Sequence, residues 1–214
     1  MEAHKIEHGL ILLGILLTAC TDDSTSSPTI SNTNHSTNAS IGVVSSPTPP
    51  FAAATRQLDV PYVPTPEKVI NEMLQMAEVQ ESDVLYDLGS GDGRIPVTAA
   101  KRFGTRGVGI DLNPQRIREA NENAQNSEVT NKVKFIQGDL FDQDISEATV
   151  VTLYLLPEVN LKLRPKILQM KPGTRIVSHN YDMGDWAPEK FKVVKTEDGI
   201  DHYVYFWRVP EQKQ

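Results

Sequence analysis

The chain has 214 residues, of which 39% are hydrophobic and 23% are charged, enough for one well-buried domain together with a tail. Its formal net charge of −7 argues against a nucleic-acid-binding protein that relies on neutralising phosphates. A single cysteine, Cys20, excludes an intrachain disulfide and a cysteine-cluster zinc site, and the histidines lack metal-ligand spacing, so we expect no bound metal.

Residues 1–20 have the pattern of a bacterial lipoprotein signal peptide. Residues 9–19 are an apolar run, too short for a stable transmembrane helix but typical of a signal-peptide core. Small residues precede Cys20 as in a lipobox, which predicts cleavage before this cysteine and its lipidation. The positive charge expected at the very start is missing, because two glutamates outnumber the one lysine there.

Residues 21–57 are rich in Ser, Thr, Asn and Pro and contain few apolar residues. Such a composition buries too little surface to offset chain entropy, so it predicts a disordered tether. We therefore expect a membrane-anchored bacterial lipoprotein or, alternatively, a cytoplasmic protein with an N-terminal extension. The folded domain is predicted over 58–210.

The first helix is predicted from the sequence Thr-Pro-Glu at 65–67. Thr65 is expected to cap the helix, Pro66 to occupy its first turn and Glu67 to interact with the positive end of the helix dipole. Apolar residues, two methionines among them, then recur at helical spacing as far as Ala77, which predicts a face packed on a sheet.

A glycine-rich turn follows the strand predicted over 83–87 and leads into a helix at 93–103. Glycines let the backbone turn tightly and approach a ligand, and the free amides at a helix N-terminus face that ligand. The next strand, 106–110, ends at Asp111, a spacing that suits a carboxylate bonding two ribose hydroxyls. The residues of the turn that we expect around the ligand are Asp87, Gly89, Gly91 and Gly93.

The spacing of this turn distinguishes between two nucleotide cofactors. Dinucleotide-binding proteins use G-x-G-x-x-G, which leaves room for a pyrophosphate. Here the spacing is G-x-G-x-G, and Asp87 stands before the first glycine. A carboxylate there repels a pyrophosphate but suits the ammonium group of a methionine moiety, so the sequence favours S-adenosylmethionine and a methyltransferase.

Strands and helices continue to alternate along the chain. We expect a helix at 114–126, strands at 132–136 and 148–155, a helix at 157–169, a strand at 174–178 and a closing hairpin of 191–195 with 202–208. Parallel strands joined by helices imply a sheet covered on both faces. The predicted fold is therefore α/β: a doubly wound, mostly parallel, seven-stranded Rossmann-like sheet with an antiparallel last strand, as in class I methyltransferases.

Four segments together point to a narrower family. They are Tyr-Val-Pro-Thr-Pro at 62–66, the glycine motif at 86–94, Gly-Asp at 138–139 and Val-Ser-His at 177–179. The chain resembles the seven-stranded protein lysine methyltransferases, both the archaeal broad-specificity type and the mitochondrial type that methylates the ATP synthase c-subunit.

The resemblance implies positions for the cofactor. Asp87 and the motif glycines are expected around its methionine moiety, Asp111 on the ribose and Asp139 beside the adenine amino group. Asp139 is alternatively a turn or helix-cap residue. Tyr62 and Thr65 are expected over the cofactor or over the channel for the acceptor lysine.

The residues after the fourth strand bear on the acceptor. Leu-Tyr-Leu-Leu-Pro at 153–157 lacks the Asn/Asp-Pro-Pro-Tyr motif of enzymes that methylate adenine amines or glutamine amides. An apolar channel lowers the pKa of a lysine amine from about 10.4, since it disfavours the charged form. Tyr154, Tyr181 or His179 are candidates to orient the neutral amine or pass its proton outward, Tyr154 first. Alternatively, Tyr154 only packs at the strand end and His179 is a satisfied buried histidine.

The predicted function is transfer of a methyl group from S-adenosylmethionine to a protein lysine. The alternatives are a small-molecule or RNA methyltransferase on the same fold, or a lipid-anchored, non-catalytic module that binds S-adenosylmethionine. We expect a monomer with a protein substrate, no nucleic-acid partner, and membrane attachment through the N-terminal lipid if the signal peptide is processed.

Overall fold

The structure is a computed structural model that describes residues 62–211. The predicted signal peptide, the lipidation of Cys20 and the tether up to residue 57 lie outside the described residues. Within 62–211, no helix is long and apolar enough to cross a membrane.

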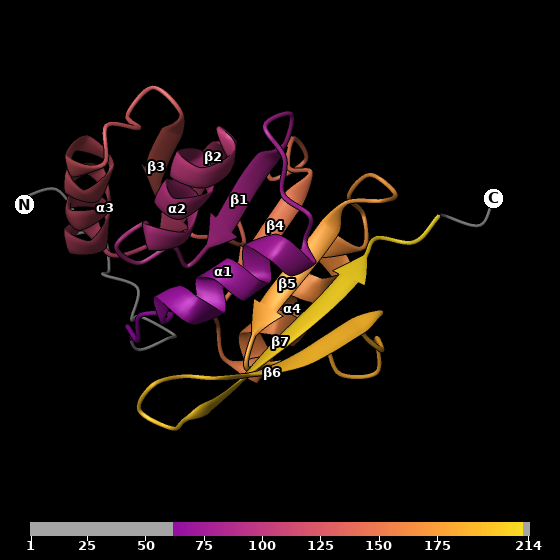
Figure 1. Cartoon of the computed structure of the whole chain (residues 1–214). Coiled ribbons are helices and arrows are strands. Elements are labelled where there is room, and N and C mark those ends of the chain that lie inside the picture. Colours follow the sequence, from indigo (N-terminus) through magenta and orange to yellow (C-terminus); the bar gives the residue numbers. More distant parts are fainter. Residues whose placement is uncertain (1–61, 212–214) are drawn as a thin grey trace, which may run out of the picture. The chain divides into compact units, whose positions relative to one another are not determined.

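A seven-stranded sheet organises the domain (Figure 1). The strands are β1 (Val84–Leu88), β2 (Arg106–Asp111), β3 (Val133–Gln137), β4 (Val150–Leu153), β5 (Arg175–His179), β6 (Lys190–Lys195) and β7 (Asp201–Arg208), in the order β3-β2-β1-β4-β5-β7-β6. β1 to β5 pair in parallel, and β7 runs antiparallel to both of its neighbours. The predicted doubly wound sheet with an antiparallel last strand is therefore confirmed.

Helices cover both faces of the sheet, and the alternation of side chains along each strand supplies two cores. The helices are α1 (Glu67–Met76), α2 (Arg94–Phe103), α3 (Pro114–Asn126) and α4 (Pro157–Ile167). On one face, α1 packs against β5 and β7, and α2 against β1 and β2; their core includes Leu85 and Phe206. On the other face, Leu163 and Ile167 of α4 pack in the core that contains Trp207. The centre of the sheet is thereby buried on both sides.

The start of α1 differs from the prediction. Its N-cap residue is Pro66, and no side chain caps the helix. The Thr65 hydroxyl instead forms a 3.2 Å hydrogen bond with Nδ1 of His179, at the end of β5. The prediction that Thr65 caps α1 is therefore wrong, because a partner distant in sequence takes its hydroxyl. Met73 and Met76 are buried in the core, as predicted.

The strand predicted over 148–155 is shorter in the structure. β4 ends at Leu153, and the chain leaves the sheet there to reach Pro157, the first residue of α4. Tyr154 and Leu155 consequently lie in the loop beyond the strand end. This loop stands at the carboxyl edge of the parallel strands, where ligands bind in doubly wound sheets.

Candidate active site

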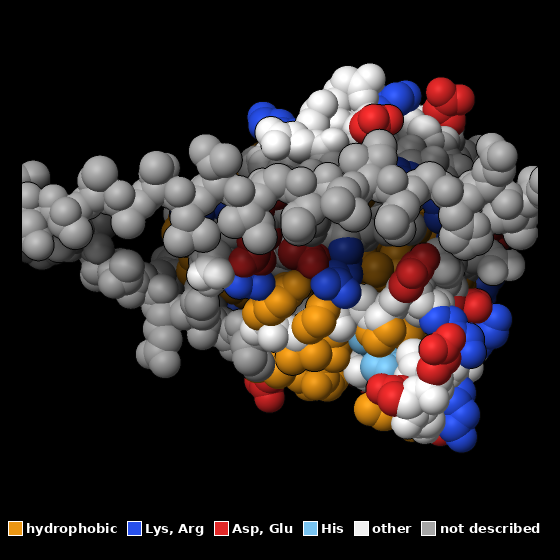
Figure 2. All heavy atoms as spheres, turned by 60° about the vertical axis from the view of Figure 1, so that its left-hand side comes forward, with side chains coloured by type: hydrophobic (Ala, Val, Ile, Leu, Met, Phe, Trp, Pro, Cys, Tyr) orange, Lys and Arg blue, Asp and Glu red, His pale blue; other side chains and the backbone are white. Residues whose placement is uncertain are grey.

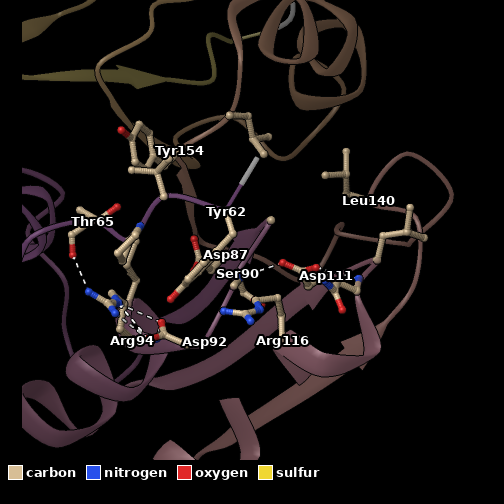
Figure 3. A pocket seen from close by; sticks show the side chains of 18 of the residues that line it. Tyr62, Thr65, Asp87, Ser90, Asp92, Arg94, Asp111, Arg116, Leu140 and Tyr154 are labelled. Atoms are coloured by element: carbon tan, nitrogen blue, oxygen red, sulfur yellow. Dashed lines mark hydrogen bonds and ion pairs between the residues drawn. The ribbon is translucent and has the colours of Figure 1, made fainter. Parts of the chain in front are cut away.

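A pocket opens at the carboxyl ends of β1, β2 and β4 (Figure 3). Its lining comes from the segment before α1, the glycine turn, the end of β2, the loop after β3 and the loop after β4. Figure 3 shows the carboxyl groups of Asp87, Asp92 and Asp111 on one side of this space, with Tyr154 and Leu140 on the other. The pocket therefore combines an acidic part with an apolar and aromatic part.

The glycine turn forms one wall of the pocket. Gly91 has a φ of +53°, and a Cβ there would lie 2.6 Å from the ring of Tyr62. A Cβ on Gly89 would lie 2.6 Å from a methyl group of Leu155. Both positions need glycine, because a side chain would fill the space where the turn meets the pocket. The third glycine of the motif, Gly93, lies outside the lining and faces the ring of Phe135.

Asp111 fixes this turn from the end of β2. One oxygen of its carboxylate accepts the amide of Gly91 at 2.8 Å, and the other accepts the amide of Asn113 at 2.8 Å. Burial raises the pKa of Asp111, and the two backbone donors oppose that effect. A carboxylate offers about four acceptor positions, so Asp111 keeps capacity for two hydroxyl donors from a ligand.

Asp87 is the most deeply buried acid in the pocket. Its carboxylate accepts the hydroxyl of Thr152 at 2.6 Å. Burial raises its pKa to about 7, since water no longer solvates the charge, and the nearby charges of Asp111 and Asp92 add to the effect. An ionised Asp87 is thus costly in the free protein, and a cationic group bound beside it would relieve that cost.

The segment 62–65 lies over the glycine turn and is attached to it by side chains. The guanidinium of Arg116 sits 4.2 Å from the centre of the Tyr62 ring. Arg94 donates hydrogen bonds to Asp92 and, at 3.2 Å, to the carbonyl oxygen of Thr65. Burial raises the pKa of Asp92, but the hydrogen bonds and charge of Arg94 outweigh it and hold that pKa below its usual value. Segment 62–65, which we call the pocket cover, and the glycine turn are therefore one connected unit.

The three residues predicted to handle the acceptor amine lie together. The ring of Tyr154 lines the pocket, 3.8 Å from the ring centre of His179 and 6.3 Å from that of Tyr181. His179 and Tyr181 stand behind it, outside the lining. Burial lowers the pKa of His179 to about 3, helped by the neighbouring His202, so this ring is neutral at physiological pH.

The loop after β5 is fixed by a buried amide on α4. Nδ2 of Asn160 donates to the hydroxyl of Ser178 and to the carbonyl oxygens of Tyr181 and Asp182, each at 3.3 Å. The Ser178 hydroxyl also donates to the carbonyl oxygen of Tyr181 at 2.6 Å. These bonds place Tyr181 close to Tyr154.

Asp139 lines the pocket in the loop after β3, as expected from its position. One of its oxygens accepts the amide of Phe141 at 2.9 Å, the arrangement of a turn aspartate. The turn therefore holds Asp139 in the wall of the pocket beside Leu140 and Phe141.

Several residues of the site carry little signal in the sequence. Thr152 is a polar residue inside a run of strand-forming residues, and this pattern is the one clue to its role beside Asp87. Arg94 is the last residue of the glycine motif, but nothing local indicates that it reaches back to residue 65. Arg116 and His202 become part of the site through tertiary contacts alone.

Comparison with known proteins finds methyltransferases. The family described as the ANTKMT methyltransferase domain matches residues 87–190. A protein-lysine N-methyltransferase of Saccharolobus islandicus is 50% identical over 157 residues, covering 72% of this chain and 96% of that protein. The lysine N-methyltransferase of the ATP synthase c-subunit from Homo sapiens is 30% identical over 162 residues, 75% of this chain and 67% of that protein.

Among solved structures, an RNA methyltransferase from Salinibacter ruber in complex with S-adenosyl-L-homocysteine is 54% identical. The match covers 71% of this chain and 97% of that one, with a TM-score of 0.65. The similar proteins thus share the fold, while their names give different acceptors. The chain belongs to the family of S-adenosylmethionine-dependent class I methyltransferases that includes the protein-lysine N-methyltransferases.

Proposed function

We propose that the chain transfers a methyl group from S-adenosylmethionine to the ε-amine of a protein lysine. One observation carries the proposal: the pocket that the glycine turn lines also has an apolar and aromatic rim, formed by Tyr154, Leu155 and Phe141. The aliphatic stem of a lysine fits such a rim, whereas a planar amide or base needs polar partners there. The 50% identity to a protein-lysine N-methyltransferase supports the same acceptor.

The proposal extends to the residues that would hold each part of the cofactor. We assign Asp87 to its ammonium group, because the buried carboxylate becomes favourable beside a cation. The backbone of Gly89 and Gly91 faces the methionine moiety, and Asp111 receives the two ribose hydroxyls. Asp139 lies on the adenine side, and Gly93 acts indirectly by letting the turn pack on its neighbours.

The cofactor supplies an activated methyl group, and the residues of this chain bind the two reactants and orient them. Tyr62 and Thr65 cover the pocket from the side of α1. Tyr154 borders the acceptor path, and its pKa is raised by burial, so it remains a neutral hydroxyl that hydrogen-bonds an amine. In-line positioning and removal of water from the amine are the main demands of this reaction.

RNA is the second candidate acceptor, and the name of the Salinibacter relative favours it. The net charge of −7 opposes it, because binding to RNA depends on neutralising phosphates. On the face drawn in Figure 2, the visible acidic and basic side chains are mixed with hydrophobic ones.

The test is transfer of a radioactive methyl group from S-adenosylmethionine into three acceptor pools: proteins, RNA and metabolites. We expect label in protein, recovered as methyl-lysine after hydrolysis, and none with the Asp111→Ala variant. Label confined to RNA or metabolites would overturn the lysine assignment. No transfer to any pool, with cofactor binding intact by calorimetry, would instead favour a non-catalytic binding module.

Attachment to a membrane through a lipid on Cys20, and a monomeric state, are further proposals that rest on the sequence. They are tested by fractionating cells that express the wild type or a Cys20→Ser variant and by measuring the mass of the purified protein in solution. Loss of the variant from the membrane fraction is the expected result. Equal membrane association of the two proteins would contradict the anchor and favour the cytoplasmic alternative.

A further inference from the structure

A line of hydrogen-bonded groups leads away from the acceptor side of the pocket. The Thr65 hydroxyl lies 3.2 Å from Nδ1 of His179, and Nε2 of His179 lies 2.8 Å from Nδ1 of His202. Thr65 lines the pocket, and the three residues are 4%, 0% and 8% exposed. The three side chains therefore form one continuous chain of hydrogen bonds inside the protein.

The two rings leave two ways to arrange their protons. A neutral imidazole has one N–H donor and one acceptor nitrogen. In one arrangement, Thr65 donates to His179, His179 donates to Nδ1 of His202, and His202 carries its proton on Nε2. In the other arrangement both hydrogen bonds run in the opposite direction, and Nε2 of His202 carries no proton. A change from the first to the second moves one proton along the whole line.

The far end of this line lacks a protein partner. Nε2 of His202 is buried and forms no hydrogen bond with the described residues. Buried polar atoms are nearly always hydrogen-bonded, so a water molecule is the expected partner. His202 as a whole is 8% exposed, whereas His179 is fully buried, so His202 is the ring nearer to solvent.

At the other end, the ring of Tyr154 covers His179 at 3.8 Å. Of the three residues, Thr65 alone lines the pocket, so a proton from the pocket enters the relay there.

We propose that Thr65, His179 and His202 form a relay that carries the proton of the acceptor ammonium out of the pocket. This inference rests on the proposed amine acceptor. The N–H bond of the ammonium breaks as an O–H bond forms at Thr65, and Thr65 gives its original proton to Nδ1 of His179. His179 passes its Nε2 proton to Nδ1 of His202, whose Nε2 proton goes to water. The amine is left neutral, and one proton has entered the solvent.

The relay returns to its starting arrangement when water fills the opened pocket. A proton from water then binds Nε2 of His202, the two ring transfers reverse, and Thr65 releases a proton to water in the pocket. A water molecule at Nε2 of His202 supplies the proton and water in the pocket takes one up, so the return step needs no other reactant. Because burial keeps His179 neutral, the proton passes through this ring without being stored on it.

The first test needs no acceptor. Imidazole nitrogen NMR on the full chain with ¹⁵N-labelled histidine rings, assigned with His179→Gln and His202→Gln variants, reports the proton on each nitrogen. We expect averaged shifts for both rings in the wild type, from exchange between the two arrangements, and a single fixed form of His179 in His202→Gln. One fixed arrangement in the wild type, or a protonated His179 at neutral pH, would overturn the relay.

The second test is kinetic and uses poly-L-lysine as the amine acceptor. In His202→Gln, whose side chain still bonds His179 but does not pass a proton, we expect kcat to fall on the order of 100-fold. The Kd for S-adenosylmethionine and the KM for poly-L-lysine should stay as in the wild type. A solvent deuterium isotope effect on kcat should appear, and added imidazole should restore part of the rate.

Two further variants separate the relay from general structural damage. Thr65→Val removes the entry hydroxyl with little change of shape and should also reduce kcat. Tyr203→Phe, at an exposed neighbour of His202 in β7, should behave as the wild type. An unchanged kcat in His202→Gln, or a loss without isotope effect or rescue, contradicts the relay. If wild type binds S-adenosylmethionine but does not methylate amines, the proposed function fails, and the NMR result then decides the relay by itself.

Discussion

Replacing Asp87 by Asn is expected to stabilise the cofactor-free protein at pH 8. Burial raises the pKa of Asp87 from its ordinary value of 3.8 to about 7, so the folded protein binds this proton more tightly than the unfolded chain does. The stabilisation by this group is complete below about pH 4 and is lost as the pH rises through about 7. The difference between 3.8 and about 7, at about 1.4 kcal/mol per pKa unit, corresponds to about 4 kcal/mol.

The assay is urea denaturation of wild type and Asp87→Asn without cofactor, at pH 4 to pH 8. Other groups titrate in both proteins, so the difference between the two isolates Asp87. The two unfolding free energies should be similar at pH 4 and should separate in favour of the variant up to pH 8. Calorimetry of the same variant should show loss of S-adenosylmethionine binding, because the amide carries no charge for the ammonium group.

Asp92→Asn is the matched control with the opposite sign. Arg94 holds the pKa of Asp92 below its usual value, so ionised Asp92 stabilises the fold and its replacement should weaken the protein at pH 8. Parallel pH profiles for wild type and Asp87→Asn, or an Asp87→Asn protein less stable than wild type at pH 8, would refute the reasoning.

Three further substitutions address the turn and the core. Asp111→Ala removes the acceptor for the amide of Gly91 and for the ribose hydroxyls. Calorimetry should therefore give at least about a 100-fold weaker Kd for S-adenosylmethionine, and an equal Kd would contradict the assignment. Gly91→Ala places a methyl group 2.6 Å from the ring of Tyr62 at a φ of +53°, so thermal unfolding should show a cost of about 1 kcal/mol or more, with weaker cofactor binding. Arg175→Met leaves the buried Asp83 without its cation and should lower the unfolding free energy by about 3 to 5 kcal/mol, while a loss below about 1 kcal/mol would show that water replaces the ion pair.

The parts of the fold that follow local rules could be predicted from the sequence. The alternation of strands and helices, the closing hairpin and the glycine turn each depend on neighbouring residues, and the structure contains all of them. The end of β4 was predicted two residues too late, because Tyr154 and Leu155 have the composition of a strand. Only the need to reach the start of α4 at Pro157 takes them out of the sheet.

The residues of the site that follow local rules could likewise be predicted from the sequence, and the others could not. Asp87 lies within the glycine motif and Asp111 follows it at the end of the next strand, so a local pattern locates both of them in the pocket. The partner of Thr65 is 114 residues away in the sequence, so local capping rules assigned its hydroxyl to the helix instead of to His179. No sequence pattern indicated a role for His202, since a histidine in an alternating strand has the pattern of an ordinary inward-facing residue.

The position of the pocket cover in the chain affects how the protein responds to proteases. Residues 62–65 precede α1 and belong to none of the seven strands, and Arg94 and Arg116 attach them to the glycine turn through side chains. Cutting the chain just before Glu67 would remove one wall of the pocket and leave every strand pairing of the sheet in place. Limited digestion at this point would thus separate folding from catalysis, giving a folded protein that has lost its activity.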